Sequence, residues 1–475
     1  MFNALNVRQH PDGRQAVTVS RRIVSSFLAN GMGKIWIVLV QLVTVPVVSV
    51  KWGPSEYGIW LMLSTVPTYV ALSSFGFGTA AAVDMTRHHA FGNHDHALRT
   101  FQSVWLLVSA VLLVIVLADG ALWVFRSEIY RSLPAFDYKE DALNTAIILV
   151  IYSVITVEMS YLIAGYQSTG RYAEGTFLYD LTIPIETCAL IAACLYDGRM
   201  SAAALAMTVV RIVAAVAYYI RLRHHEPWIR FGWSHASLQT LKRLAHPALA
   251  SMSMTLSTAL SLQGLTLSLG LIASPAATAA FATARTVTRI PLQLAGLSSR
   301  ATLPEMTRAF SRGDKALSAN LIILNLGFTA VIVAPFTLAF VVLGPYIVEV
   351  LSRHRLHASR ELFTWLALVA LLQAIWTTIG QFLFAINKQH RFAYHYLVLA
   401  GLTAAAPVLV GQSATVTRSA IVWCAAEAIM LVIVYRVWWT EAGLDYTAFV
   451  GGAARIGSRA KLLALNALRR QGDVS

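Results

Sequence analysis

Residues 100–123 read TFQSVWLLVSAVLLVIVLADGALW, a run in which Asp119 is the only charged side chain. A helix needs about 20 predominantly apolar residues to cross the hydrocarbon core of a bilayer, so this run predicts a transmembrane helix. Eleven further runs have the same character, at roughly 23–50, 58–83, 142–165, 176–195, 202–220, 245–272, 277–299, 318–343, 362–386, 396–411 and 419–438. The sequence therefore predicts an all-α polytopic membrane protein with twelve transmembrane helices.

The composition excludes a soluble globule. The chain of 475 residues is 57% hydrophobic and 13% charged, whereas soluble proteins average about 45–50% apolar and about 25% charged residues. The net charge of +14 does not predict nucleic-acid binding, because the basic residues lie between apolar runs and not on one soluble face. The 3 cysteines lie inside apolar runs and form neither a disulfide framework nor a cysteine zinc site. We expect no cofactor and no metal.

The basic residues predict the orientation of the chain. With a cytoplasmic N-terminus, 24 of the 37 Lys and Arg residues fall in cytoplasmic segments, nine on the opposite face and four inside spans. Cytoplasmic loops carry the excess of Lys and Arg, so both termini are predicted to be cytoplasmic. Residues 1–22 form a polar N-terminal segment. Residues 441–475 form a basic tail, which is either an amphipathic helix on the anionic leaflet or a disordered segment.

Short motifs recur at an offset of 219–221 residues. The pairs are Pro54 with Pro275, Gly76 with Gly296, Asp84–Arg87 with Glu305–Arg308, Asp95–Leu98 with Asp314–Leu317, and Arg171–Ala173 with Arg391–Ala393. The first and seventh spans run in the same direction, so this is a parallel repeat. It predicts a six-helix N-lobe at 23–220, a cytoplasmic linker at 221–244 and a six-helix C-lobe at 245–440. Such two-lobed transporters bind substrate between the lobes and alternate its access by rocking.

The first quarter of the chain carries a family resemblance. A polar, basic start precedes a short turn that contains Gly53, Pro54, Glu56, Tyr57 and Gly58, and Gly76 and Gly78 then precede Thr86-Arg87. This pattern resembles the polysaccharide-transporter branch, which includes the O-antigen flippases, of the multidrug/oligosaccharidyl-lipid/polysaccharide (MOP) exporter superfamily. The resemblance implies transfer of an undecaprenyl-pyrophosphate-linked oligosaccharide from the inner to the outer leaflet, and it brings no catalytic residues.

Ionisable residues inside spans are costly and mark functional sites or ion pairs. Arg285 and Arg289 are one i,i+4 step apart and project from one face of a Thr-rich span. Neither recurs at its repeat position, where Thr65 and Tyr69 stand, and Lys34 of the first span is also unrepeated. We interpret Lys34, Arg285 and Arg289 as lining a central cationic cavity, because guanidinium forks and ammonium groups bind phosphate oxygens.

Other intramembrane charges allow two interpretations. Arg211 either joins the substrate-binding cations or forms a structural ion pair with Glu158 or Glu186 of the same lobe. These two carboxylates and Glu427, which is the only carboxylate within a C-lobe span, are candidates for ion coupling or for structural pairing. The histidines after the second span lack regular ligand spacing and are interpreted as a solvated loop, not a metal site: His88, His89, His94 and His96.

The leading hypothesis is a flippase for lipid-linked oligosaccharides in the bacterial inner membrane, working as a monomer without enzymatic activity. Polysaccharide polymerases and glycosyltransferases are its expected partners, besides membrane lipids. A multidrug or organic-cation antiporter of the same superfamily is the first alternative, although such a site should be acidic and aromatic. A membrane-embedded polymerase or ligase is less favoured, because the outer loops 124–141 and 344–361 are short. A scaffold subunit without transport activity is the remaining alternative.

Overall fold

The computed structural model describes residues 39–442, apart from residues 41, 75, 133–137, 312–314, 387 and 412–414. Within these ranges the chain is helical and contains no β-strand. Nine helices are long and apolar enough to cross a membrane, or ten with a bent pair that runs from Leu42 to His89. Lys34, the N-terminal segment 1–22 and the basic tail after residue 442 lie outside the described residues, as does most of the first predicted span. The count of twelve spans is therefore not tested, whereas the all-helical, multi-pass architecture is confirmed.

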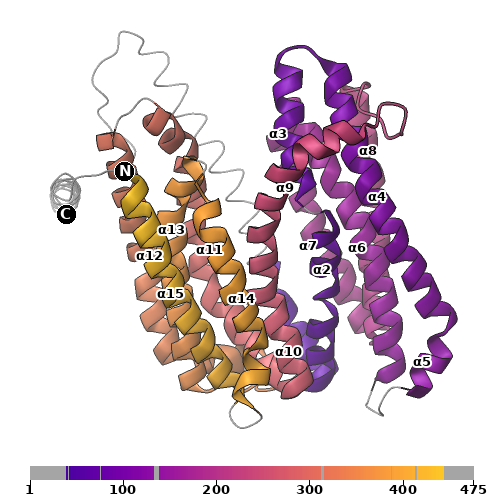
Figure 1. Ribbon diagram of the computed structural model, residues 1–475. Coiled ribbons are helices and arrows are strands. Elements are labelled where there is room, and N and C mark those ends of the chain that lie inside the picture. The colour runs from indigo at the N-terminus through magenta and orange to yellow at the C-terminus, as the bar shows by residue number, and fades with distance from the viewer. Residues whose placement is uncertain are drawn as a thin grey trace, which may run out of the picture.

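The helices form two lobes that stand side by side (Figure 1). In the N-lobe, α6 packs against α2, α3, α4 and α8, and α8 packs against α7. Its elements are α2 (Val66–Ala71), η2 (Leu72–Ser74), α3 (Phe77–Ala90), α4 (His94–Val124), α5 (Arg126–Ser132), α6 (Lys139–Ser168), α7 (Tyr172–Tyr196) and α8 (Met200–His225).

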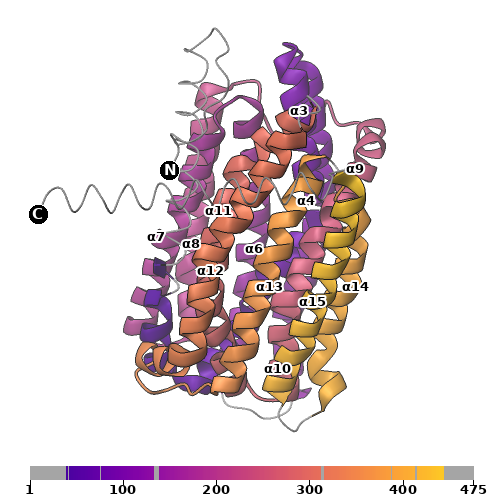
Figure 2. The same ribbon diagram turned by 90° about the vertical axis from the view of Figure 1, so that its left-hand side faces the viewer.

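In the C-lobe, α11, α12 and α13 pack against one another, and α15 packs against α13 and α14 (Figure 2). Its elements are α9 (Leu238–Ala259), η3 (Leu260–Gly264), α10 (Leu265–Ile272), α11 (Pro275–Ser311), α12 (Lys315–Leu351), α13 (Arg360–Ala385), α14 (His390–Val410) and α15 (Thr415–Ala442). The helix α9 lies between the lobes, because it packs against α3 and α4 on one side and α14 on the other. The C-terminal end of α8 and the N-terminal end of α9 fall inside the segment predicted as the linker 221–244.

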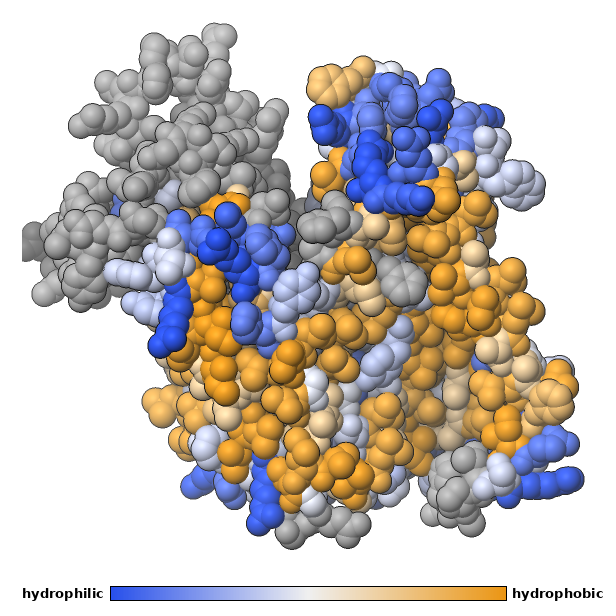
Figure 3. Space-filling model, viewed as in Figure 1, coloured by the Kyte–Doolittle hydropathy of each residue, from blue (hydrophilic) through white to orange (hydrophobic). Residues whose placement is uncertain are grey.

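The surface of the described residues suits a bilayer. Figure 3 shows hydrophobic side chains over the middle of both lobes and hydrophilic side chains gathered at the two ends. Large apolar side chains such as Leu117, Val213 and Leu338 are exposed. A soluble protein would leave few apolar patches of this extent on its surface, so the middle band is the lipid-facing surface.

The two repeated corners of the sequence meet at one end of the molecule, the lower end in Figure 1. Gly53 has a φ of +75° directly before Pro54, a backbone conformation that glycine adopts without steric cost. A few residues later, Gly58 lies so close to Pro275 that a Cβ at this glycine would overlap the Pro275 carbonyl. A Cβ on Gly270 would likewise overlap the side chain of Met62. We call this contact between the lobes the seam, and this end of the molecule the seam end.

A buried apolar cluster continues the seam. It includes Trp60 and Cys194 of the N-lobe and Leu265 and Trp423 of the C-lobe. Since close-packed apolar side chains from both lobes leave little space for water, the two lobes are closed against each other at this end.

The repeat is not symmetric in structure. Gly76 has a φ of +72° and precedes α3, at the break where the chain bends by 47° between Leu42–Ser74 and Phe77–His89. Its repeat partner, Gly296, lies inside the continuous helix α11. A Cβ on Gly76 would overlap the carbonyl of Ala248 in α9, so this glycine permits the close approach of α9 to the N-lobe.

Candidate functional site

The two cations predicted from the sequence line a cavity whose lining residues all belong to the C-lobe, whereas the sequence predicted a central cavity between the lobes. Arg285 and Arg289 belong to α11 and open into a cavity of about 630 Å³. At 1.5 Å per residue they lie about 15 and about 21 Å from the start of α11 at the seam end, near the middle of a bilayer-sized helix. The walls come from α9, η3, α11, α13 and α14 and include Leu262, Gln263, Gln293, Gln373, Trp376, Thr377, Gln381 and Tyr396.

Arg285 is held by backbone and hydroxyl oxygens. Its guanidinium donates to the carbonyl of Leu262 at 2.5 Å and to the Thr266 hydroxyl at 2.7 Å, and it lies 5.7 Å from the centre of the Phe281 ring. Leu262 belongs to η3, a single π-helical turn. Such turns interrupt the regular ladder of helix hydrogen bonds and are frequent at functional sites. All of these partners are neutral, so none of them offsets the charge of the guanidinium.

Arg289 is held in the same way by an amide. Its guanidinium donates to Oε1 of Gln373 on α13 at 2.6 Å. Among the residues that the structure describes, neither Arg285 nor Arg289 has a carboxylate within ion-pair distance. The cavity wall therefore carries two positive charges that have no ion-pair partner among the described residues.

Glu427 forms no ion pair with either arginine. This buried carboxylate accepts one hydrogen bond from the indole of Trp376 at 2.5 Å and another from the indole of Trp423 at 2.9 Å. Trp376 belongs to α13, and Trp423 lies one turn before Glu427 in α15. Both oxygens of Glu427 thus accept from neutral donors, and neither lies within ion-pair distance of Arg289.

Arg211 is engaged within the N-lobe. Its guanidinium contacts the Glu186 carboxylate twice, at 2.5 and 2.6 Å, and donates to the Tyr152 hydroxyl at 2.8 Å. The tyrosine in turn donates to Glu186 at 3.0 Å. The structure thus contains the ion pair that the sequence offered as one interpretation, with Glu186 as the partner. Whether Arg211 also meets substrate stays a prediction.

Glu158 has a separate environment. Its two oxygens accept from the indole of Trp105 and the hydroxyl of Ser109, both on α4 and both at 2.7 Å. No described cation pairs with it, so Glu158 and Glu427 share one pattern, an intramembrane carboxylate bound by indole groups. The predicted coupling role of these carboxylates stays a prediction.

The four histidines that were predicted to form a solvated loop lie instead in the last turn of α3 and the first turn of α4, where their rings form contacts. The His88 ring stacks on His96 with centroids 5.3 Å apart, and the His94 ring contacts His89 and Trp228 at 5.0 and 5.2 Å. In the described ranges, no group of three or more His, Cys, Asp or Glu residues is arranged to hold a metal ion.

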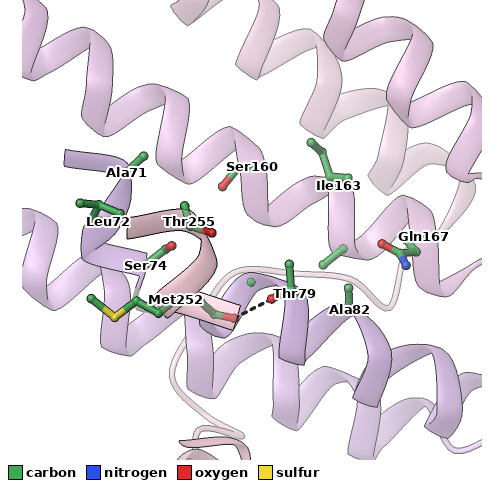
Figure 4. Close-up of a pocket in the computed structure, with 13 residues that line it drawn as sticks. Ala71, Leu72, Ser74, Thr79, Ala82, Ser160, Ile163, Gln167, Met252 and Thr255 are labelled. Atoms are coloured by element: carbon green, nitrogen blue, oxygen red, sulfur yellow. Dashed lines mark hydrogen bonds between the residues drawn. The ribbon is translucent and has the colours of Figure 1, made fainter. Parts of the chain in front are cut away.

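A second, smaller cavity lies between α3, α6 and α9 (Figure 4). Its volume is about 280 Å³, and its polar lining consists of hydroxyl and amide side chains such as Ser160, Gln167 and Thr255. No charged residue lines it. The larger cavity is therefore the better candidate for an anionic ligand.

Sequence reasoning missed most of the polar wall around the two arginines. Gln373, Thr377 and Gln381 occupy i, i+4 and i+8 positions of α13, and that spacing on an otherwise apolar span is a signal that could have been found. The participation of Gln263 and Trp376 depends on contacts between helices and left no comparable signal.

These features define a class of protein: a two-lobed, multi-pass membrane transporter with a cationic cavity. Solved structures share the fold. An inward-facing multidrug resistance MATE family transporter of the MOP superfamily has a TM-score of 0.63 and 13% identity, covering 89% of this chain and 99% of that one. A mutant of the Vibrio cholerae MATE transporter VcmN has a TM-score of 0.63 and 14% identity, covering 91% and 99%.

The family described as Lipid II flippase MurJ matches residues 83–438, about three quarters of the chain. This chain belongs to that family, and the predicted MOP exporter superfamily is confirmed. No curated protein matches the sequence.

Proposed function

We propose that this protein carries a polyprenyl-diphosphate-linked oligosaccharide from the inner to the outer leaflet of a bacterial cytoplasmic membrane. The O-antigen or exopolysaccharide repeat unit is the substrate that we favour within this class. Both termini are proposed to be cytoplasmic, which makes the seam end the outer end.

The observation that carries this proposal is the charge of the C-lobe cavity. Arg285 and Arg289 face about 630 Å³ of space with neutral partners only. An unpaired charge at mid-membrane depth is costly. A diphosphate would supply the missing negative charge, and guanidinium forks match phosphate oxygens in a bidentate geometry.

The same chemistry disfavours a cationic drug as substrate. A cation in this cavity would meet two guanidinium groups, whereas the nearby carboxylate, Glu427, already accepts two indole hydrogen bonds. Since the likeness to multidrug transporters rests on 13–14% identity, it supports the fold and not the substrate.

The lobes supply a path for the proposed movement. The diphosphate binds at the two arginines while the seam is closed, and the prenyl tail stays in the lipid. Opening of the seam and closure of the opposite end then expose the head group outside. Lys34 and Arg211 are proposed as further contacts of the diphosphate, and Glu158 and Glu186 as candidates for coupling to an ion.

Flipping by purified protein in liposomes tests the proposal. We expect Arg289→Ala and Arg285→Ala to abolish transfer of a fluorescent undecaprenyl-diphosphate-linked oligosaccharide, because each removes one of the two positive charges that line the cavity. Arg289→Lys should retain part of the activity, since it keeps the charge and loses the fork. Arg223→Ala is the matched control, because this exposed arginine lies on α8 and does not line the cavity.

Four outcomes are informative. Loss in the alanine variants with normal insertion and a normal Arg223→Ala control supports the proposal. Normal transfer by the double variant Arg285→Ala/Arg289→Ala contradicts it. Faster transfer of lipid II than of an O-antigen intermediate would make lipid II the favoured substrate. Uptake of a cationic dye instead of either lipid would favour the antiporter.

A further inference from the structure

The larger cavity has two polar stripes that face each other. Arg285, Arg289 and Gln293 stand at i, i+4 and i+8 of α11 and thus share one helix face. Gln373, Thr377 and Gln381 stand at the same spacing on α13. The two helices pack against each other (Figure 2). They run in the same direction, because α12 returns between them.

The bond between Arg289 and Gln373 sets the relative height of the stripes. One helical turn rises about 5.4 Å, so Gln293 and Thr377 lie about one turn beyond this bond, away from the seam end, and Gln381 lies about two turns beyond it. The cavity therefore has a cationic tier nearer the seam and an amide tier further from it.

The amide tier has unused hydrogen-bonding capacity. Gln293 and Gln381 are partly exposed to the cavity, and no described residue makes a hydrogen bond with either side chain. Each glutamine amide has two N–H donors and a carbonyl acceptor. Such groups match the hydroxyl and N-acetyl groups of an uncharged sugar, and they carry no net charge at any pH.

The order of the two tiers corresponds to the covalent order of the substrate. A sugar joined to a diphosphate is held next to it, so a diphosphate on Arg285 and Arg289 places that sugar on the next one to two helical turns, where Gln293 and Gln381 stand. We propose that Gln293 and Gln381 form a subsite for the uncharged sugar linked directly to the diphosphate. This inference rests on the proposed function, because the cationic tier must hold the diphosphate.

Two soluble probes separate the tiers. Farnesyl diphosphate carries the charge alone, and farnesyl-diphosphoryl-N-acetylglucosamine adds one uncharged sugar. Binding of each radiolabelled probe is measured on the full-length protein in nanodiscs. We expect the wild type to bind the glycosylated probe about tenfold more tightly, and Gln293→Leu/Gln381→Leu to lose this preference while keeping its affinity for farnesyl diphosphate.

A matched control and a separate arm complete the design. Gln167→Leu changes a glutamine of the smaller N-lobe cavity and should leave both affinities unchanged. Equal binding of the two probes by the wild type, or equal loss of both in the double variant, overturns the sugar subsite. A failure of the proposed function gives a different result: Arg289→Ala then does not weaken the binding of farnesyl diphosphate.

Discussion

The close contact of Gly58 with Pro275 makes closure of the seam sensitive to a single methyl group. A Cβ at residue 58 would overlap the backbone carbonyl of Pro275, and a backbone atom cannot rotate away as a side chain can. Overpacking of this kind typically costs about 1–3 kcal/mol. At about 1.4 kcal/mol per factor of ten, Gly58→Ala should shift the ratio of seam-open to seam-closed protein by about 5- to 150-fold.

Spin labels at the seam end would measure this ratio. Arg199 follows α7 and His357 precedes α13, and their side chains are 68% and 70% exposed. In a cysteine-free background, labels at these positions in Gly58→Ala should give a larger long-distance fraction by double electron–electron resonance than in the unsubstituted protein.

A glycine without a close neighbour provides the control. A Cβ on Gly120 of α4 would meet no atom within 4 Å, so Gly120→Ala should leave the distance distribution unchanged. If Gly58→Ala folds normally and gives the same distribution as this control, the seam is not the closed gate that the contact indicates.

Two further predictions concern stability. Glu186→Ala leaves the Arg211 guanidinium buried without its partner, which should lower the unfolding free energy by about 3–5 kcal/mol and cause a large fall in the Tm in detergent. The apolar double variant Arg211→Met/Glu186→Leu should recover most of the lost stability. An unchanged Tm for the single variant would refute the reasoning. Asp141 accepts hydrogen bonds from the backbone N–H groups of Met200 and Ser201 at the start of α8. Asp141→Ala should therefore lower the unfolding free energy by about 1 kcal/mol, as for a lost N-cap, and Asp141→Asn should lower it by less. Equal Tm values for the unsubstituted protein and both variants would contradict the capping role.

Several structural features followed from the local sequence. The apolar runs predicted membrane helices, because a chain in lipid must satisfy its backbone hydrogen bonds within each helix. Helical periodicity placed Arg285 and Arg289 on one face, and both line the cavity. The recurrence of Pro54 at Pro275 marked the two corners that bring the lobes together at the seam.

The partners of the buried charges could not be predicted in this way. Periodicity gives the direction of a side chain on its own helix, but not which neighbouring helix faces it. Arg211 had two candidate carboxylates in its lobe, and packing chose Glu186 while Glu158 received an indole and a hydroxyl.

By itself, the sequence determined the membrane-spanning class, the duplicated frame and the depth of the two cavity arginines, since all three depend on composition and spacing along the chain. Only the tertiary structure decided that Glu427 binds Trp376, 51 residues away, and that Gln373 of another helix holds Arg289. The physical reason is that the net charge of a buried site depends on which groups from separate helices come within hydrogen-bond distance, and long-range packing determines those distances.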